Sequence, residues 1–206
     1  MNANVYDIAV IGSGFAGSLL ASIVRRLGRS VILLERDRHP RFAIGESSTP
    51  LANLLLDDLT TRYDLSALKP LAKWGTWQQA YPQIPCGLKR GFTFYHHTLG
   101  APAACYSDRT KQLLVAASPH DKIADTHWYR ADFDEFFVRE AQNVGVEYID
   151  EIQLNSVAES KHELTFRGTR SLKQLTVRAR FVVDATGPHC FCCHRPVSVG
   201  FGVGFL

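Results

Sequence analysis

Three glycines near the N-terminus have the spacing of a phosphate-binding turn. Gly12, Gly14 and Gly17 form the pattern G-x-G-x-x-G in the segment GSGFAG. In this pattern the first glycine permits a tight turn, the second lets a pyrophosphate approach the backbone, and the third allows a helix to pack closely on a strand. A helix that starts at such a turn also offers unpaired N–H groups and a partial positive charge to phosphates. The pattern is common on its own, so its meaning depends on the elements around it.

The residues around the glycines predict those elements. Residues 5–11 form a short apolar run typical of a strand buried on both faces, and residues 15–27 carry apolar side chains at helical spacing. Residues 30–36 predict a second buried strand, and its Glu35 follows the third glycine by 18 residues. A carboxylate at this place can accept hydrogen bonds from both hydroxyls of a ribose. We therefore expect a βαβ unit with parallel strands that binds an adenine dinucleotide.

The remaining segments predict a mixed α/β chain. Thr49 and Pro50 have the types preferred at the N-cap and first position of a helix. Residues 132–145 predict another helix, with Asp132 and Glu135 at capping-box spacing. Residues 89–97 alternate as one strand would. Further strand-like segments are residues 146–157, 163–168 and 174–187, of which the last two are expected to pair as a hairpin.

Composition excludes several classes of protein. The chain has 206 residues, of which 46% are hydrophobic, which suits one sizeable domain or one domain with a satellite. The formal net charge is +3, and the 23 lysines and arginines are dispersed, so no nucleic-acid partner is expected. No apolar run is long enough to cross a membrane, and the N-terminus does not have the pattern of a signal peptide. These features predict a cytoplasmic protein.

Five segments together resemble a known family. They are VIGSGFAGS, ERDRHPRFAIGESSTP, LKRGFTFYHH, WYRADFDEFF and VVDATGP, in family order across residues 5–188. They resemble the flavin-dependent monooxygenase superfamily and, more narrowly, the flavin-dependent halogenases of the tryptophan-halogenase-like type. The resemblance implies an α/β fold with a Rossmann-like FAD-binding domain of the glutathione-reductase type, a β-rich insertion and a C-terminal truncation.

The resemblance also implies FAD as the cofactor and a set of residues that bind it. The glycine turn would face the pyrophosphate, and Glu35 would lie on the adenosine ribose. The loop from Ile44 to Pro50 would run beside the flavin, and the strand-end turn with Asp184, Thr186 and Gly187 would close on the dinucleotide. The full cofactor-binding set is Gly12, Gly14, Phe15, Ala16, Gly17, Glu35, Arg36, Gly45, Ser47, Ser48, Arg130, Asp184 and Gly187.

Lys89 is the candidate catalytic residue. In the resembled family a lysine opens a strand of the form K-x-x-apolar-x-F and passes an electrophilic halogen to the substrate, and KRGFTF has this spacing. An ammonium between apolar residues can be desolvated, which lowers its pKa and makes the nitrogen available as a donor or nucleophile. The alternative is a solvated lysine at the start of a strand, beside Arg90.

The implied activity is that of an FAD-dependent oxidoreductase of halogenase type, in which reduced flavin, oxygen and halide give an electrophilic halogen relayed by the lysine. The implied partners are a halide, a small-molecule substrate, for which an aromatic compound is one option, and a separate flavin reductase. Three alternatives remain open from the sequence: a flavin monooxygenase, an enzyme similar to the reductases of isoprenoid double bonds, and a catalytically inactive dinucleotide-binding fragment.

A dense group of cysteines and histidines lies near the C-terminus. The segment HCFCCH, residues 189–194, holds three cysteines and two histidines. A structural zinc site needs a second pair of ligands far along the chain, and a redox C-x-x-C needs a helix N-terminus, so we expect no metal site here. In the resembled family the DATGP segment is followed by a long substrate-binding region. We therefore expect residues 1–188 to form an incomplete FAD-binding domain with part of the substrate-domain insertion, and residues 189–206 to be an aberrant tail from a frameshift or truncation.

Overall fold

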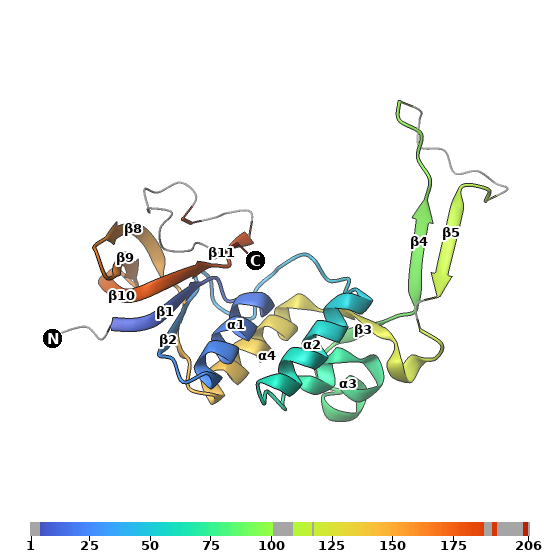
Figure 1. Cartoon of the computed structure of the whole chain (residues 1–206), viewed down its shortest axis with the longest axis horizontal. Coiled ribbons are helices and arrows are strands. Elements are labelled where there is room, and N and C mark those ends of the chain that lie inside the picture. The colour runs from blue at the N-terminus through green and yellow to red at the C-terminus, as the bar shows by residue number, and fades with distance from the viewer. Residues whose placement is uncertain (1–4, 101–108, 117, 188–190, 193–203, 206) are drawn as a thin grey trace.

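The apolar run at residues 5–11 becomes a central strand of the main sheet. The computed structural model describes residues 5–100, 109–116, 118–187, 191–192 and 204–205. In this part of the chain the main sheet has seven strands, ordered β7-β2-β1-β10-β9-β8, with β11 beside β10 (Figure 1). Strands β7, β2, β1, β10 and β11 pair in parallel, whereas β10, β9 and β8 pair antiparallel. The bounds are β1 Val5–Ile11, β2 Val31–Leu34, β7 Glu147–Ile149, β8 Gln153–Glu159, β9 Leu164–Arg170, β10 Lys173–Asp184 and β11 Gly204–Phe205.

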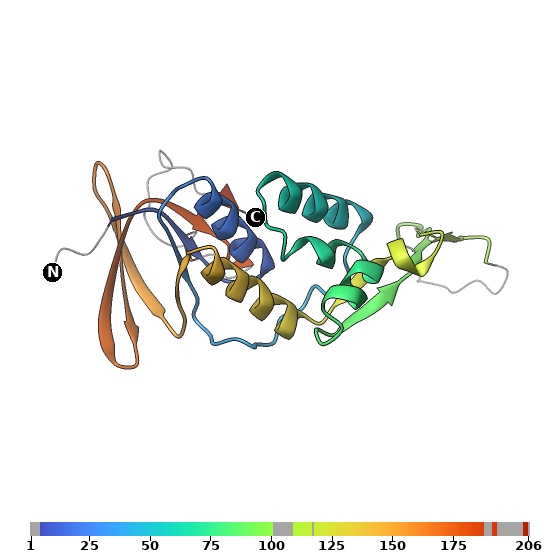
Figure 2. The same cartoon turned by 90° about the horizontal axis from the view of Figure 1, so that it is seen from below.

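Two helices cover one face of this sheet, and their apolar sides explain why. Helix α1 (Phe15–Arg26) follows β1, and α4 (Arg130–Asn143) lies beside it (Figures 1 and 2). Ala21 of α1 and Ala141 of α4 are fully buried in one cluster with Val10 of β1. The βαβ unit and the hairpin between β9 and β10 are therefore confirmed. The helix predicted at residues 132–145 begins two residues earlier, because α4 starts at Arg130. The predicted capping box is also wrong, since the N-cap residue of α4 makes no side-chain capping bond.

A second layer packs on the side of these helices away from the sheet. It contains α2 (Pro50–Arg62), a 3₁₀ turn (Lys69–Ala72) and α3 (Trp74–Ala80). Thr49 caps α2 as predicted, since its hydroxyl accepts a hydrogen bond from Ala52 N at 3.1 Å. The core of this layer is aromatic: the Phe133 ring stacks on Trp77 at 5.4 Å and on Trp128 at 4.5 Å between ring centroids. Such stacked pairs add to the gain from burial.

The segment at residues 89–97 differs from its prediction as one strand. It divides at Arg90 into the end of β3 and the start of β4, and the two strands have different partners. Gly91 marks the division, because a Cβ there would lie 2.2 Å from the Val115 carbonyl oxygen. The β4–β5 hairpin then projects away from the helices (Figures 1 and 2). The bounds are β3 Cys86–Lys89, β4 Gly91–Tyr95, β5 Gln112–Ala116 and β6 Asp125–Trp128, with a 3₁₀ turn at Asp121–Ile123.

Among the described residues, no helix has the length and apolar character needed to cross a membrane.

Candidate dinucleotide site and buried lysine

The glycine turn between β1 and α1 has the tight geometry that its sequence predicts. Gly12 has a φ of +98°, and a Cβ on it would lie 2.6 Å from the Ala185 carbonyl oxygen. A Cβ on Gly17 would lie 2.1 Å from the Gly12 carbonyl oxygen. The turn is thus held between the start of α1 and the residues that follow β10, and both the tight turn expected at Gly12 and the close packing expected at Gly17 are confirmed.

Gly14 differs from the other two glycines because charged side chains, and not backbone atoms, lie nearest to it. It is the N-cap of α1 with a φ of −63°, a conformation that any residue can adopt. A Cβ on Gly14 would lie 3.5 Å from an Arg130 guanidinium nitrogen, 3.8 Å from an oxygen of the Asp134 carboxylate that pairs with Arg130, and 3.9 Å from a guanidinium nitrogen of Arg41. The first turn of α1 contains no acidic residue. A helix N-terminus flanked by two guanidinium groups favours an anion at this place.

Phe15 and Ala16 form the start of α1 and are half-buried. The Phe15 ring packs edge-on against Trp128, with 4.9 Å between centroids. Its side chain therefore belongs to the aromatic core, and only the backbone of these two residues can take part in binding phosphate.

Glu35 anchors the turn from the end of β2. Its carboxylate accepts hydrogen bonds from Ser13 N and Ser13 Oγ, both at 2.8 Å, and from Asp37 N at 3.1 Å. Arg41 lies 3.2 Å away and forms an ion pair. Burial raises the pKa of this carboxyl, but the hydrogen bonds and Arg41 outweigh burial and hold the pKa below its usual value. Arg36, in contrast, is exposed and contacts Asp37 instead of this cluster.

Two residues near Glu35 were missed by the sequence predictions. His39 Nε2 lies 2.7 Å from Ser13 Oγ, and Arg41 pairs with Glu35. The other ring nitrogen of His39 and the Nε of Arg41 are buried without a hydrogen-bond partner. Burial lowers the pKa of His39. The run RDRHPR, which directly follows Glu35, was a signal that cationic side chains gather at this edge of the sheet.

The turn after β10 lies against the glycine turn. Ala185 N donates to Ile11 O at 2.8 Å. The buried Asp184 carboxylate accepts from Thr186 N at 3.1 Å and from Cys192 N at 2.7 Å, so it shapes the turn from within. Gly187 has a φ of +66° and open space around its Cβ position. The turn therefore lies against the glycine turn, and its predicted contact with the dinucleotide stays a prediction.

Arg130 ties the turn to the loop at residues 44–49. Its Nε and Nη2 both lie 2.8 Å from the Asp134 carboxylate, which is fully buried. Its Nη1 donates to Ile44 O at 2.7 Å and to Gly45 O at 3.3 Å. Gly45 has a φ of +93°, which a side chain would strain. One guanidinium thus touches the loop and lies beside Gly14 at the start of α1.

Lys89 lies under the other end of the same loop and is only 6% exposed. Its Nζ donates to Ser47 Oγ at 2.7 Å and to the Ser48 carbonyl, and lies 4.0 Å from the centre of the Phe92 ring. Desolvation lowers the pKa of Lys89, and the carboxylate of Asp125 opposes this effect. The alternative of a solvated lysine is therefore wrong. The residue also ends β3 instead of opening β4, because β3 pairs with β6.

The two predicted serines of the loop have different surroundings. Ser47 is exposed, and its hydroxyl contacts Lys89. Ser48 is 2% exposed, and its hydroxyl donates to Thr126 O at 2.7 Å. Ser48 therefore holds the loop against β6, and Ser47 is the serine that a ligand can reach.

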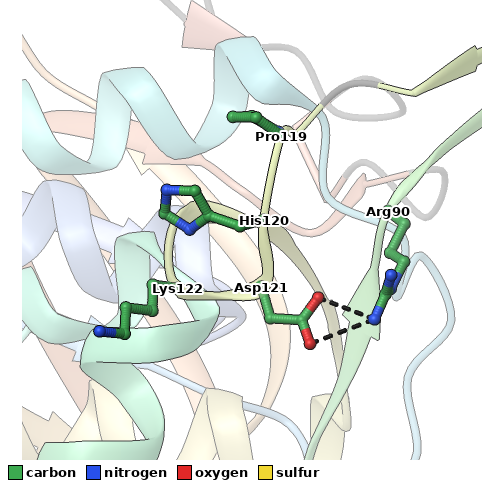
Figure 3. Close-up of a pocket in the computed structure, with 5 residues that line it drawn as sticks. All are labelled: Arg90, Pro119, His120, Asp121 and Lys122. Carbon is green, nitrogen blue, oxygen red and sulfur yellow. Dashed lines mark hydrogen bonds and ion pairs between the residues drawn. The ribbon is translucent and has the colours of Figure 1, made fainter.

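A shallow hollow lies beside the base of the β4–β5 hairpin and contains none of the predicted site residues. Its volume is about 650 Å³, and it is lined by Arg90, Pro119, His120, Asp121 and Lys122 (Figure 3). Arg90 pairs with both oxygens of Asp121, at 2.9 and 3.1 Å, and so neutralises that charge (Figure 3).

The cysteine-rich segment lies mostly outside the described residues. Of residues 189–194, only Phe191 and Cys192 are described, and Cys192 is buried in the core of the main sheet. The described residues contain no group of three side chains that could hold a metal ion. The prediction for residues 189–206 stays a prediction.

Known proteins are similar to this chain over most of its length. The family of NAD(P)-binding Rossmann-like domains matches residues 10–67. Tetracycline 7-halogenase of Kitasatospora aureofaciens is 28% identical over 184 residues, which cover 88% of this chain and 31% of the relative. Flavin-dependent halogenase armH5 of Armillaria mellea is 32% identical over 158 residues, which cover 75% of this chain and 25% of the relative. The crystal structure of halogenase PltM in complex with phloroglucinol and FAD has a TM-score of 0.72 at 29% identity, covering 87% of this chain and 34% of that one.

The sheet, the glycine turn and these similarities define a Rossmann-like domain similar to the FAD-binding part of solved halogenases. Within that class the chain is a relative of the flavin-dependent halogenases, as its five motifs predicted. It spans about a quarter to a third of the length of these relatives.

Proposed function

We propose that this chain supplies the FAD-binding turn and the halogen-carrying lysine of a flavin-dependent halogenase. The observation that carries the proposal is the loop at residues 44–49. Arg130, which lies beside Gly14, holds one end of this loop, and the buried amine of Lys89 holds the other. One short segment thus links a phosphate-binding turn to a desolvated amine.

The residues present fit a dinucleotide. The start of α1 and the guanidinium groups of Arg41 and Arg130 would hold the pyrophosphate in the space beside Gly14. Glu35 would hold the adenosine ribose, where the partnerless buried atoms of His39 and Arg41 also gather. A ribose hydroxyl could accept a hydrogen bond from Arg41 Nε, and another could bond His39 Nδ1, which would complete this cluster. Gly45 and Ser47 would face the flavin from the loop.

Lys89 would carry the halogen. Bound reduced FAD would supply, with oxygen, the oxidising power that turns a halide into an electrophilic halogen. Burial makes the nitrogen of Lys89 a better nucleophile than that of a solvated lysine, because the charged form, which has no lone pair, is disfavoured. The exposed Ser47 hydroxyl, 2.7 Å from the amine, marks the side from which halogen and substrate would arrive. We further propose an aromatic small molecule as substrate and a separate flavin reductase as partner.

Halide-dependent product formation tests this proposal. The chain would be incubated with FAD, NADH, a purified flavin reductase, bromide and phloroglucinol as the probe, with catalase present to remove free peroxide. Mass spectrometry would then detect bromination through the paired isotope pattern. We expect brominated phloroglucinol from the wild type, none from Lys89→Met, and an unchanged yield from Lys122→Met, an exposed lysine used as the matched control.

Two other outcomes would contradict the proposal. Hydroxylated product that forms without halide would identify a monooxygenase. A folded chain that binds FAD but gives no product would identify a dinucleotide-binding fragment.

A further inference from the structure

Four buried polar residues surround the groups that Lys89 contacts. Ser48 and Asp125 are each 2% exposed, and Asn53 and Thr126 are fully buried. They come from three different elements: the loop at residues 44–49, α2 and β6. Buried polar groups are costly unless they are hydrogen-bonded, so a cluster of four beside a buried amine needs an explanation.

Asn53 is the centre of this cluster. Its side-chain amide donates to Ser48 Oγ at 3.1 Å and to Asp125 Oδ1 at 2.7 Å. Ser48 is bonded to Thr126 by its backbone N–H, at 3.2 Å, and by its hydroxyl, at 2.7 Å. Ser48 is therefore fixed to both α2 and β6. Its carbonyl oxygen, which accepts from Lys89, is fixed with it.

Asp125 is the charged member of the cluster. It is the cross-strand partner of Lys89 in the pairing of β3 with β6. The other described groups around the amine are neutral: Ser47 and Ser48 of the loop and the ring of Phe92. Arg90, next in the chain, is exposed and paired with Asp121.

We propose that Asp125 and Asn53 are the positioning residues of Lys89: Asn53 fixes the Ser48 carbonyl, and Asp125 supplies the compensating charge that keeps the amine directed at Ser47. The proposal rests on the proposed function of Lys89 and adds the residues that hold it. A carboxylate favours the ammonium form of a nearby lysine, whereas burial favours the neutral amine. Asp125 therefore sets what fraction of Lys89 is uncharged at a given pH.

Lysine titration by NMR tests the proposal without flavin, halide or turnover, so its failure is distinguishable from failure of the proposed function. The chain contains seven lysines, and their ¹³Cε signals report the charge of each amine during a pH titration. Lys89→Met assigns the Lys89 signal. Asp125→Asn is the test variant, because an amide oxygen at this position can still accept the bond from Asn53. Asp121→Asn is the matched control, a carboxylate paired with the neighbouring Arg90.

We expect Asp125→Asn to lower the titration midpoint of Lys89, so that the neutral fraction at a fixed pH below the midpoint rises roughly threefold or more. Asp121→Asn should leave the midpoint unchanged. An unchanged midpoint in folded Asp125→Asn, or an equal change in both variants, would overturn the proposal.

Asn53→Ala provides a second, independent test should Asp125→Asn fail to fold. This variant keeps the charge of Asp125 but removes the bond that fixes Ser48 to α2, while the two bonds from Ser48 to Thr126 remain. We expect the Lys89 signal at pH 7 to move toward those of the exposed lysines. A Lys89 signal that stays at its wild-type position would overturn the role of Asn53.

Discussion

At the scale of single residues, Glu35 does most to organise the dinucleotide turn. One carboxylate holds the backbone and hydroxyl of Ser13, the backbone of Asp37 and the guanidinium of Arg41. Its side chain is 8% exposed, so these bonds form in a desolvated place where each is worth more than at the surface. The residue therefore shapes the turn in addition to its proposed contact with ribose.

Glu35→Gln tests this shaping role. The amide keeps the size of the side chain but puts a donor where acceptors are needed, so we expect the free energy of unfolding at pH 7 to fall by about 1–3 kcal/mol. The folded pKa of Glu35 lies below the unfolded value of 4.5, so its stabilising effect is complete above pH 4.5 and is lost as the pH falls through the folded pKa. The difference between wild type and variant should therefore shrink below pH 4.5. Urea unfolding at pH 7 and pH 3 measures it, with exposed Glu46→Gln as control, and an equal difference at both pH values would count against the role.

At the scale of elements, the packing of α1 onto β1 depends on one missing side chain. A Cβ on Gly17 would overlap the Gly12 carbonyl oxygen at 2.1 Å, whereas a Cβ on Gly14 meets its nearest atom at 3.5 Å. The two glycines are three residues apart on the same turn, yet Gly17 is needed for the fold and Gly14 leaves space for a ligand. A pair of alanine variants can separate these roles.

Gly17→Ala should destabilise the chain by about 1–3 kcal/mol, the usual cost of overpacking in a rigid core. Gly14→Ala, with ordinary contacts and a φ of −63°, should unfold at nearly the wild-type temperature. Thermal unfolding followed by circular dichroism measures both. Equal melting temperatures for wild type and Gly17→Ala would contradict the packing that the structure describes.

Sequence patterns predicted the elements whose signals are local. The βαβ unit followed from the apolar runs and the glycine turn, and the start of α2 followed from Thr49 and Pro50. The division of residues 89–97 into two strands was not predictable, because it depends on the pairing of β3 with β6 and of β4 with β5, which are distant in sequence. The start of α4 was misplaced for a similar reason, since Arg130 is held by the loop at residues 44–49.

The candidate site likewise has a part that the sequence predicted and a part that it did not. Glycine spacing and family motifs identified the turn, Glu35 and Lys89. Asn53 and Asp125 lie outside these motifs, and each gains its role only from contacts that folding creates. Arg41 lies within one of the motifs, but its pairing with Glu35 appears only in the fold. Sequence alone also could not decide whether Lys89 is buried, because that depends on the loop that covers it.

At the scale of the whole molecule, the described chain consists of a dinucleotide-binding sheet, a helical layer and a projecting hairpin (Figures 1 and 2). The hairpin exposes Phe94, Leu113 and Leu114, and α2 exposes Leu51 and Leu54. A two-stranded hairpin is marginally stable alone, and exposed apolar surface of this kind usually marks a contact surface. The chain spans about a third of the length of PltM. The dinucleotide turn is built entirely from described residues of β1, β2, α1 and the turn after β10.

Binding of FAD is therefore the most direct test of the account. Titration of FAD with the chain, followed by flavin fluorescence, would measure the affinity, with ADP as competitor. We predict saturable binding that ADP displaces, and a loss of affinity of roughly tenfold or more in Gly14→Ala, because the new methyl group fills the space proposed for the pyrophosphate. A folded wild-type chain that shows no saturable binding, or a Gly14→Ala variant that binds FAD as tightly as the wild type, would contradict the account.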